Sequence, residues 1–382
     1  MKIIDLFAGC GGLSLGFKRE NFKSIAYLDW EQSCVDTLIE NFSHDKSASF
    51  LCEDIQESFS TNSNSAKLLN EIGDNAVDGI IGGPPCQAYS MAGRVRDPQG
   101  MKNDYRNYLF ESYIKWLERI QPSFFVFENV TGMLSAKPGG PPIVNLISKA
   151  FDNAGYALST IDKKTVINLA NLGGNQNRKR VIIFGINKNK FNDCERRIDT
   201  FYRYLENEKS HNYTGSVRKA FKGLEKLFPL KHPTGRLSHQ TSLSDDLHKC
   251  RFHNTRDIQI FRILAEDLEK ESPEYTSTES LKKLYREKVG KSSAVHKYYV
   301  LRWDQPSNLI PAHLYKDGLR HIHPDPQQAR SITVREAARL QDFPDEFKFK
   351  NSQTENFKMI GNAVSPLMAE IIAKAVKVAM YK

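Results

Sequence analysis

The sequence predicts an α/β fold with a doubly wound, mostly parallel sheet and a second, smaller domain inserted into it. In the first half of the chain, short apolar runs alternate with amphipathic stretches of helical period. A polar residue of chemical interest follows four of these runs, namely Asp29, Asp54, Cys86 and Glu128. Because ligands gather at the carboxyl ends of the strands in such sheets, this recurrence predicts one binding edge.

The strands and helices of the first half are expected from these runs in order. The apolar runs predict strands at Lys2–Phe7, Ser24–Leu28, Phe50–Cys52, Val77–Ile81, Ser123–Phe127 and Lys179–Ile186. Helices are expected from the glycine cluster to Phe17 and at Gln32–Asn41, Asn107–Ile120 and Ile143–Ala154, with a Ser/Asn-rich loop at Ser58–Ser65. No helix precedes the first strand, so the apolar helix expected at Ser365–Met380 is predicted to cover the sheet there.

The middle of the chain loses this regular alternation. Helices are expected at Arg218–Leu227, Ile258–Glu271 and Ser280–Val289, and regular patterning returns at Ser331–Gln341. The 382 residues are enough for two domains. We therefore expect a catalytic and cofactor-binding domain at 1–187 plus 352–382, and a second domain with a hinge at 188–351.

Positive charge is concentrated in the middle segment. The chain has a net charge of +9, and residues 186–325 alone hold 26 Lys and Arg against 19 Asp and Glu. A near-neutral body with a basic insert fits a polyanionic partner that docks on the insert, and an ordinary lysine-rich surface fits equally well.

Composition also limits the cellular setting and the metal chemistry. No apolar run approaches the roughly 20 residues of a membrane helix, and the amino terminus has no signal-peptide pattern. We expect a cytoplasmic protein without membrane contact, whose six cysteines are free thiols. A zinc site at His248, Cys250 and His253 with Cys194 is conceivable, but the spacing matches no usual zinc finger, and no metal is expected.

The first strand leads into a glycine-rich turn, DLFAGCGG at residues 5–12. Such a turn is a tight bend about as often as a ligand cradle, but acids end the next two strands at Asp29 and Asp54. An acid about 20 residues after the glycines is placed to accept hydrogen bonds from a ribose. The combination favours a nucleoside-type cofactor, with Trp30 either as a flat face for its base or as a core residue.

The segment Gly82-Gly83-Pro84-Pro85-Cys86-Gln87 is the most specific feature of the sequence. Two prolines fix the backbone directly before a thiol, while Cys10, Cys34 and Cys52 fit small buried hydrophobes. The polar, basic stretch from Gln87 to Arg106 fits a mobile lid.

An acid and a basic cluster complete the candidate chemistry. Glu128 follows four apolar residues, so its carboxyl is expected to be partly withdrawn from water. In the segment Gln176–Arg180, Arg180 is expected to point into the site while Arg178 and Lys179 contact phosphate, and a basic strand edge is the alternative. A thiol, an acid, an arginine and a nucleoside cofactor suggest addition of a thiolate to an electron-poor ring.

In these motifs, and in their order, the sequence resembles the DNA (cytosine-5)-methyltransferases of bacterial restriction-modification systems. The resemblance covers about residues 2–186 and 327–380, and only the middle segment is unmatched. DLFAGCGG, Asp29-Trp30 and Asp54-Ile55 resemble the cofactor motifs, and PPCQ resembles the nucleophile motif. Asn107-Tyr108-Leu109, ENV, QNRKR, residues 329–344 and Gly361-Asn362-Ala363-Val364 are similar to the remaining motifs.

The resemblance implies a Rossmann-like sheet and a defined reaction. Cys86 adds to carbon 6 of a cytosine flipped out of duplex DNA, Glu128 holds ring nitrogen 3 and the amino group, and Arg180 contacts the ring oxygen. Carbon 5 takes the methyl group of S-adenosylmethionine, which leaves as S-adenosylhomocysteine. The catalytic set implied is Cys86, Glu128, Arg178 and Arg180.

Further residues and partners follow from the same resemblance. The implied cofactor residues are Phe7, Ala8, Gly9, Gly11, Asp29, Trp30, Asp54, Ile55, Pro84, Leu109, Asn362 and Val364. The implied DNA contacts in the lid are Gln87, Ser90, Arg94, Arg96 and Arg106, and the basic middle segment corresponds to the target-recognition region. Double-stranded DNA is the expected partner, and a cognate restriction endonuclease that acts independently is a further one.

Three positions depart from the family's pattern, and two other functions stay open. Asp29 stands where the family commonly has Glu, Met359 where it has Gln, and Ser365 where it has Pro, which affects the expected cofactor affinity rather than the nucleophile. A tRNA cytosine-5 methyltransferase and a catalytically inactive DNA-binding relative are the alternatives. The large basic segment favours DNA, and the intact Cys86, Glu128 and Arg180 favour an enzyme.

Overall fold

The chain forms two compact units. The structure is a computed structural model and describes residues 1–44, 47–72, 76–85, 109–137, 140–209, 214–293 and 297–381. Unit 1 comprises Met1–Gly173, Arg178–Asn212 and Ala363–Lys382, and unit 2 comprises Gly174–Asn177 and Tyr213–Asn362. The main divisions therefore fall after residues 212 and 362, whereas the sequence predicts them after residues 187 and 351.

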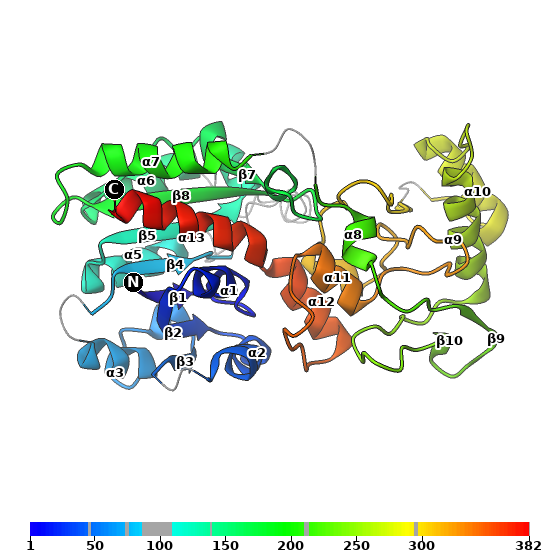
Figure 1. Cartoon of the computed structure of the whole chain (residues 1–382), viewed down its shortest axis with the longest axis horizontal. Coiled ribbons are helices and arrows are strands. Elements are labelled where there is room, and N and C mark those ends of the chain that lie inside the picture. Colours follow the sequence, from blue (N-terminus) through cyan, green and yellow to red (C-terminus); the bar gives the residue numbers. More distant parts are fainter. Residues whose placement is uncertain are drawn as a thin grey trace. The chain divides into compact units, whose positions relative to one another are not determined.

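Unit 1 is built on an eight-stranded sheet with the order β3-β2-β1-β4-β5-β8-β6, in which β7 also pairs with β8. The strands are β1 (Lys2–Leu6), β2 (Lys23–Asp29), β3 (Ser49–Cys52), β4 (Gly79–Gly82), β5 (Phe124–Val130), β6 (Tyr156–Leu158), β7 (Val166–Asn168) and β8 (Lys179–Asn187). Strands β3, β2, β1, β4 and β5 are mutually parallel, and β8 runs antiparallel to β5, β6 and β7. The predicted mostly parallel, doubly wound sheet is confirmed (Figure 1).

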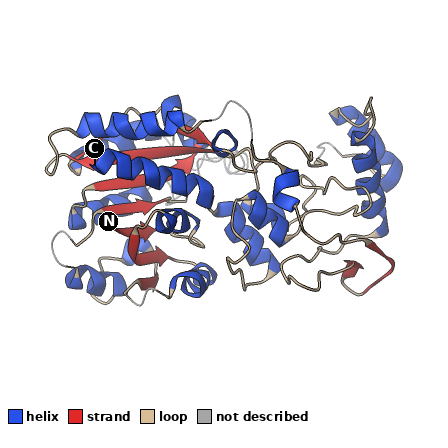
Figure 2. Cartoon of the chain, viewed as in Figure 1, coloured by secondary structure: helices blue, strands red, loops and turns tan. Residues whose placement is uncertain are grey.

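Helices cover both faces of this sheet (Figure 2). They are α1 (Gly12–Arg19), α2 (Gln32–Phe42), α3 (Asn64–Glu71), α5 (Leu109–Ile120), α6 (Ile143–Asn153), α7 (Cys194–Asn207) and α13 (Pro366–Tyr381). Alternate residues of β5 divide the core: Phe125 and Phe127 pack with α3, α5 and α6, and Phe124 and Val126 pack with α1, α7 and α13. A strand buried on both faces explains the continuous apolar run at 124–127.

The carboxyl-terminal helix α13 covers the sheet beside β1, as predicted. Its Ala369 lies against Gly16 of α1, where a Cβ atom would come within 2.4 Å of the alanine side chain. Arg197 of α7 donates hydrogen bonds to the carbonyl oxygens of Ala379 and Met380, both at 2.9 Å, and so caps the helix end. Both ends of the chain therefore lie in unit 1.

Several elements of unit 1 depart from the expectations. Strands β6 and β7 and helices α3 and α7 were not predicted, and α3 begins inside the expected loop Ser58–Ser65. Strand β5 continues to Val130 because its last residues pair with β8, so Glu128 lies inside the strand rather than after it. Helix α7 belongs to unit 1 because Phe201 stacks on Phe184 of β8, with ring centroids 4.2 Å apart.

Unit 2 consists mainly of helices and long loops, with one two-stranded hairpin. Its elements are α8 (Val217–Phe221), β9 (Pro229–Thr234), β10 (Leu237–His239), α9 (Thr255–Leu268), α10 (Thr278–Val289), the 3₁₀ helix η6 (Ala312–Tyr315), α11 (Val334–Leu340) and α12 (Gln353–Asn362). The predicted helix Arg218–Leu227 is wrong beyond Phe221, because the chain turns at Gly223 with a φ of 79°. Helix α12, which was not predicted, packs on η6, where a Cβ on Gly361 would lie 2.4 Å from Pro311 backbone.

A buried ion pair organises the core of unit 2. Arg330 and Glu336 are 0 % and 1 % exposed, and both guanidinium Nη atoms donate to the carboxylate, at 2.7 and 2.6 Å. Glu336 also closes a capping box with Thr333 at the start of α11. Arg330 lowers the pKa of the Glu336 carboxyl far below its ordinary value, against the opposing effect of burial. Removing one partner would leave an uncompensated buried charge.

Four buried histidines of unit 2 are held neutral, and one of them, His323, has its Nε2 atom 3.5 Å from Glu336 Oε1. Burial lowers the pKa of His239 and His321 to about 4, and that of His253 and His323 to about 3. Their rings bond to protein groups; for example, His239 Nε2 lies 2.9 Å from the Gln328 carbonyl, and His253 Nε2 accepts from the Ser331 backbone N–H at 3.2 Å. Unfolding would expose these rings to water and restore the ordinary affinity for protons.

We predict that acid unfolds unit 2 before unit 1. Below pH 6.5 these histidines bind protons in the unfolded state but stay neutral in the folded state. The free energy of unfolding therefore falls from pH 6.5 toward pH 4, by up to about 2 kcal/mol per histidine at pH 5. In unit 1, burial raises the pKa of Asp5 to about 7, an effect of opposite sign because acid then favours the folded form. Hydrogen exchange at pH 7 and pH 5, corrected for intrinsic rates, should show protection lost first in α9 and α11. Simultaneous loss in β1 and β5 would contradict the prediction.

Candidate active site

The strand order brings the predicted cofactor residues to neighbouring strand ends. Because β3, β2, β1 and β4 are adjacent and parallel, the segments that follow them meet at one edge of the sheet. Asp54, Asp29, Phe7 and Pro84 lie, respectively, at the ends of these strands or within two residues after them. The observed strand order thus places these four residues at one edge of the sheet, where the sequence predicts a binding edge.

The glycine-rich turn after β1 adopts a backbone that most residues avoid. Phe7, Gly9 and Gly11 have φ values of 58°, 55° and 89°, and the Ala8 backbone N–H donates to the Leu28 carbonyl of β2 at 3.0 Å. A Cβ atom at Gly11 would lie 2.6 Å from the ring of Phe42, whereas one at Gly9 would meet no atom within 4 Å. The turn is thus packed behind Gly11 and open at Gly9.

Asp29 ties this turn to the end of β2. Its two carboxylate oxygens accept hydrogen bonds from the backbone N–H groups of Gly9 and Glu31, at 2.8 and 2.9 Å. Burial raises the pKa of the Asp29 carboxyl, and the two hydrogen bonds oppose that rise. The following Trp30 is 67 % exposed, so it is not the core residue that the alternative interpretation requires.

The remaining predicted cofactor residues divide between exposed and buried positions. Asp54 is exposed and caps the 3₁₀ helix η1 (Ile55–Glu57) by accepting from the Gln56 N–H at 3.0 Å. Ile55, Leu109 and Val364 are 3 %, 6 % and 8 % exposed, and Ala8 and Pro84 are also buried. Asn362 is exposed at the end of α12 and belongs to unit 2, while Val364 belongs to unit 1.

Asp5 is a buried titratable group at this edge that the sequence did not single out. It is 0 % exposed in the middle of β1, and its Oδ2 accepts from the Ser14 hydroxyl of α1 at 2.5 Å. Burial raises the pKa of Asp5 to about 7, and nearby Asp29 adds to the rise. The sequence carries a signal for this residue, because an acid inside an apolar strand is expected to be withdrawn from water.

Glu128 and Arg180 form an ion pair across the β5–β8 ladder. Arg180 lies opposite Val130, so Glu128 two residues earlier shares its face of the sheet as a diagonal neighbour. Arg180 Nε lies 2.6 Å from Glu128 Oε1, and the side chains are 10 % and 11 % exposed. The predicted acid and arginine are therefore brought together, with little access to water.

The turn that leads to Cys86 is fitted around this carboxylate. A Cβ atom on Gly83 would lie 2.6 Å from Glu128 Oε2, so only glycine fits the present position of that side chain. Asn129 donates from Nδ2 to the Pro84 carbonyl at 3.5 Å. Consecutive residues of β5 thus contact the start of the proline turn, a relation that spacing in the sequence cannot reveal.

Arg178 does not occupy the exposed position expected of a phosphate contact. It is 1 % exposed and donates from Nη2 to the Ala363 carbonyl at 2.8 Å. Burial and the neighbouring charge of Arg180 hold the pKa of its guanidinium well below the ordinary value. Arg178 therefore joins β8 to the segment that enters α13, and the expected phosphate contact is wrong for this side chain.

Several predictions fall on parts of the chain for which the structure gives no description. Cys86, Gln87, Ser90, Arg94, Arg96 and Arg106 lie outside the described residues, as do Asn107 and Tyr108 of the predicted helix. The five described cysteines are free thiols, and Cys52 is exposed rather than buried as expected.

The described residues also bear on metal binding and membrane spanning. Among them, no three His, Cys, Asp or Glu side chains come together to hold a metal ion. No helix in the described ranges combines the length and apolar character needed to cross a membrane.

Comparison with known proteins decides the family. Residues 1–378 match the family model of the C-5 cytosine-specific DNA methylases. The chain belongs to this family. The family resemblance noted from the motifs is thereby confirmed, and it extends across the middle segment, which the motifs did not cover.

Curated relatives match over nearly their full lengths. The type II methyltransferase M.Bpa9945I of Bacillus paralicheniformis is 31 % identical, over 99 % of this chain and 98 % of the relative. The type II methyltransferase M.FnuDI of Fusobacterium nucleatum is 32 % identical, over 99 % of this chain and 94 % of the relative.

Solved structures share the fold. A prophage-encoded DNA modification methyltransferase from E. coli superposes with a TM-score of 0.66 at 25 % identity, over all of both chains. The Dnmt2 methyltransferase of S. pombe has a TM-score of 0.58 at 13 % identity, over 100 % of this chain and 98 % of the other, a likeness of fold alone.

We predict that Gly83→Ala lowers methyl-transfer activity by about 100-fold, because the added methyl displaces Glu128. The measurement is kcat on duplex DNA, together with circular dichroism to confirm folding. Gly140→Ala is the matched control, because a Cβ there meets no atom within 4 Å. Equal activity of the two variants would contradict the importance of this contact.

Proposed function

We propose that this protein transfers a methyl group from S-adenosylmethionine to carbon 5 of a cytosine flipped out of a specific sequence in duplex DNA. The observation that carries the proposal is the buried Glu128–Arg180 pair beside the Gly83-Pro84-Pro85 turn, in a member of the C-5 cytosine-specific DNA methylase family. The carboxylate of Glu128 offers a hydrogen-bond acceptor and the guanidinium of Arg180 offers donors, so the pair can bind the polar edge of a cytosine ring.

The residues at the strand ends fit an adenosyl group. Asp29 and Asp54 supply carboxylate acceptors, Trp30 supplies an exposed aromatic face, and Gly9 leaves backbone open to a ligand. The oxygens of Asp29 retain lone pairs beyond the two backbone hydrogen bonds. When bound, S-adenosylmethionine supplies the methyl group that carbon 5 takes up, and it leaves as S-adenosylhomocysteine.

In this proposal Cys86 is the nucleophile. Its thiolate forms a bond to carbon 6 of the cytosine, and the electrons of the carbon 5–carbon 6 double bond shift toward carbon 5. After methylation, carbon 5 loses its proton and the bond between sulfur and carbon 6 breaks. This step restores the double bond and returns the thiolate.

Glu128 and Arg180 hold the ring during this sequence. Glu128 faces ring nitrogen 3 and the amino group, and Arg180 donates to the ring oxygen, which draws electron density away from carbon 6. Because both side chains are about nine-tenths buried, water competes weakly for these hydrogen bonds. Flipping costs a few kcal/mol of stacking, which contacts of this kind offset.

Unit 1 is the catalytic unit and unit 2 the DNA-reading unit in this proposal. Unit 2 holds 26 Lys and Arg against 19 Asp and Glu, and so most of the net positive charge. Phosphate contacts from such a surface position a protein on duplex DNA. We assign further contacts to Gln87, Ser90, Arg94, Arg96 and Arg106, and infer a cognate restriction endonuclease that acts independently on the same sequence.

Bisulfite sequencing of DNA from cells that express the chain tests the function directly. We expect cytosines at one recurrent sequence to resist bisulfite conversion. The same result is expected when duplex DNA is treated with the purified protein and S-adenosylmethionine. Methyl transfer to tRNA alone would replace the DNA assignment. DNA binding without methyl transfer would identify an inactive relative.

We predict that Cys86→Ser abolishes turnover, by at least about 1,000-fold, and leaves DNA binding within about threefold, because only the nucleophile is lost. Duplex DNA with 5-fluorocytosine at the target should trap a covalent adduct on Cys86 of the native protein, since fluorine cannot leave as the proton does. Peptide mapping of the adduct to any other residue would refute the assignment.

A further inference from the structure

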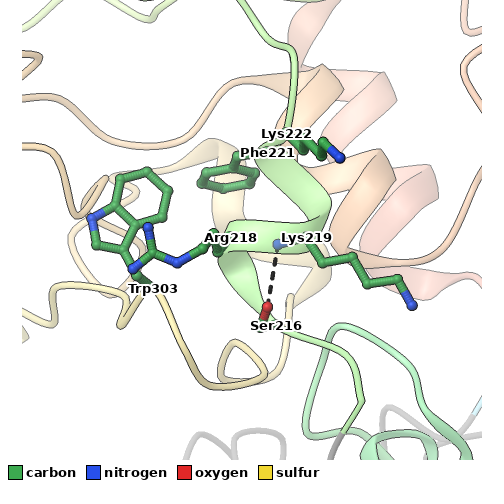
Figure 3. Close-up of a pocket in the computed structure, with 6 residues that line it drawn as sticks. All are labelled: Ser216, Arg218, Lys219, Phe221, Lys222 and Trp303. Carbon is green, nitrogen blue, oxygen red and sulfur yellow. Dashed lines mark hydrogen bonds between the residues drawn. The ribbon is translucent and has the colours of Figure 1, made fainter.

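The Arg218 side chain of unit 2 contacts two neighbouring side chains on the surface, Asp304 and Trp303, of which Figure 3 shows Trp303. Its Nε and Nη2 atoms donate to Asp304 Oδ1 and Oδ2, at 2.7 and 3.1 Å. The centre of the guanidinium lies 5.3 Å from the ring centroid of Trp303, over the indole face. Arg218 and Trp303 line an open pocket of about 620 Å³, together with Ser216, Lys219, Phe221 and Lys222.

The support beneath Arg218 is rigid. The backbone N–H groups of Val217 and Arg218 donate to the carbonyls of Gln305 and Trp303, at 3.0 and 2.8 Å. Trp303 packs edge-to-face on Phe221, with centroids 6.3 Å apart, and Phe221 stacks on the buried ring of His323. Trp303 and the backbone of Arg218 therefore rest on the core of unit 2, and the contacts with Asp304 and Trp303 reduce the side-chain entropy that ligand binding would remove.

The hydrogen bonds to Asp304 leave a defined edge of the guanidinium for a ligand. Asp304 accepts from the edge formed by Nε and Nη2. The edge at the end of the side chain, formed by Nη1 and the second N–H of Nη2, bears parallel N–H groups. The Arg218 side chain is 60 % exposed, and no partner for Nη1 is found among the described residues. Two parallel donors match the O6 and N7 acceptors that guanine presents in the major groove.

Charge favours a base edge over a phosphate at this position. The carboxylate of Asp304, 76 % exposed, neutralises the guanidinium and would repel a phosphate that approaches the same pocket. A neutral guanine edge meets no such penalty. Lys219 and Lys222 of the same helical turn are exposed and have no ion pair within the described ranges, so their charges remain available to phosphates.

We propose that Arg218, buttressed by Asp304 and Trp303, reads a guanine of the recognised sequence, while Lys219 and Lys222 contact phosphates of the same duplex. The inference rests on the proposed function, since the recognised sequence of a cytosine methyltransferase contains at least the guanine paired with the target. It assigns a specificity-determining residue rather than a catalytic one.

The test compares Arg218→Lys with the native protein on the sequence found by bisulfite sequencing. Lysine keeps the charge but loses the paired donors, so kcat/KM on that sequence should fall roughly 10- to 100-fold. Discrimination against replacement of one particular G·C pair should fall by a similar factor. Asp304→Asn should lose part of the same discrimination, and circular dichroism establishes that both variants fold.

Two controls separate this role from an ordinary surface ion pair. Arg256→Lys changes an exposed arginine of the same unit that is paired with Asp257 at 3.1 Å, and it should leave discrimination unchanged. Replacing one guanine at a time by 7-deazaguanine removes only the N7 acceptor. The native protein should lose activity at one such position, and Arg218→Lys should be insensitive to it.

Three outcomes would overturn the proposal. In the first, Arg218→Lys behaves as Arg256→Lys does. In the second, Arg218→Gln weakens binding equally on all sequences and lowers the salt dependence, whereas Arg218→Lys keeps both the discrimination and the salt dependence, which would make Arg218 a phosphate contact. In the third, the native protein methylates no cytosine, which would show that the proposed function itself has failed.

The salt dependence of DNA binding tests the phosphate contacts of Lys219 and Lys222. The double variant Lys219→Gln and Lys222→Gln should reduce the slope of log binding constant against log salt by about 2, with the methylated sequence unchanged. An unchanged slope would remove both lysines from the interface.

Discussion

The candidate active site depends on the antiparallel pairing of β8 with β5. Pairing brings Glu128 and Arg180, more than fifty residues apart in the chain, to diagonal positions on one face of the sheet. It also extends β5 to Val130, which directs Glu128 against Gly83 and Asn129 toward the Pro84 carbonyl. A shift of β8 by one residue in this register would turn Arg180 to the face opposite Glu128 and break the ion pair.

The rest of unit 1 keeps that register fixed. Both faces of β5 and β8 are covered, by α3, α5 and α6 on one side and by α1, α7 and α13 on the other. Tyr113 of α5 donates from its hydroxyl toward the carbonyls of Ile80 and Val126, at 2.9 and 3.1 Å, where β4 and β5 meet. The parallel strand ends at the other side of β4 then supply the acids and the open glycine that we propose to bind the adenosyl group.

Unit 2 combines an apolar cluster, to which α9 and α10 contribute, with a buried polar network. It has few strands, and it is organised by Arg330–Glu336 and by neutral histidines rather than by a large apolar sheet. Such a core is sensitive to acid, but it fixes loops by directional bonds. The aromatic cluster of Phe221, Trp303 and His323 rests on it and supports the guanidinium of Arg218 at the surface.

By itself, the sequence determined the alternating α/β pattern, the parallel strands, the covering role of the last helix and the family, because period, glycine and proline spacing, and motif order are local properties. It also pointed to Glu128 and Arg180. Only the tertiary structure decided that Arg178 is buried, that Asp29 accepts a hydrogen bond from Gly9 of the glycine-rich turn, that α7 belongs to unit 1, and that Arg218 meets Trp303 and Asp304. Each of these depends on contacts between residues distant in sequence, for which no local pattern carries a signal.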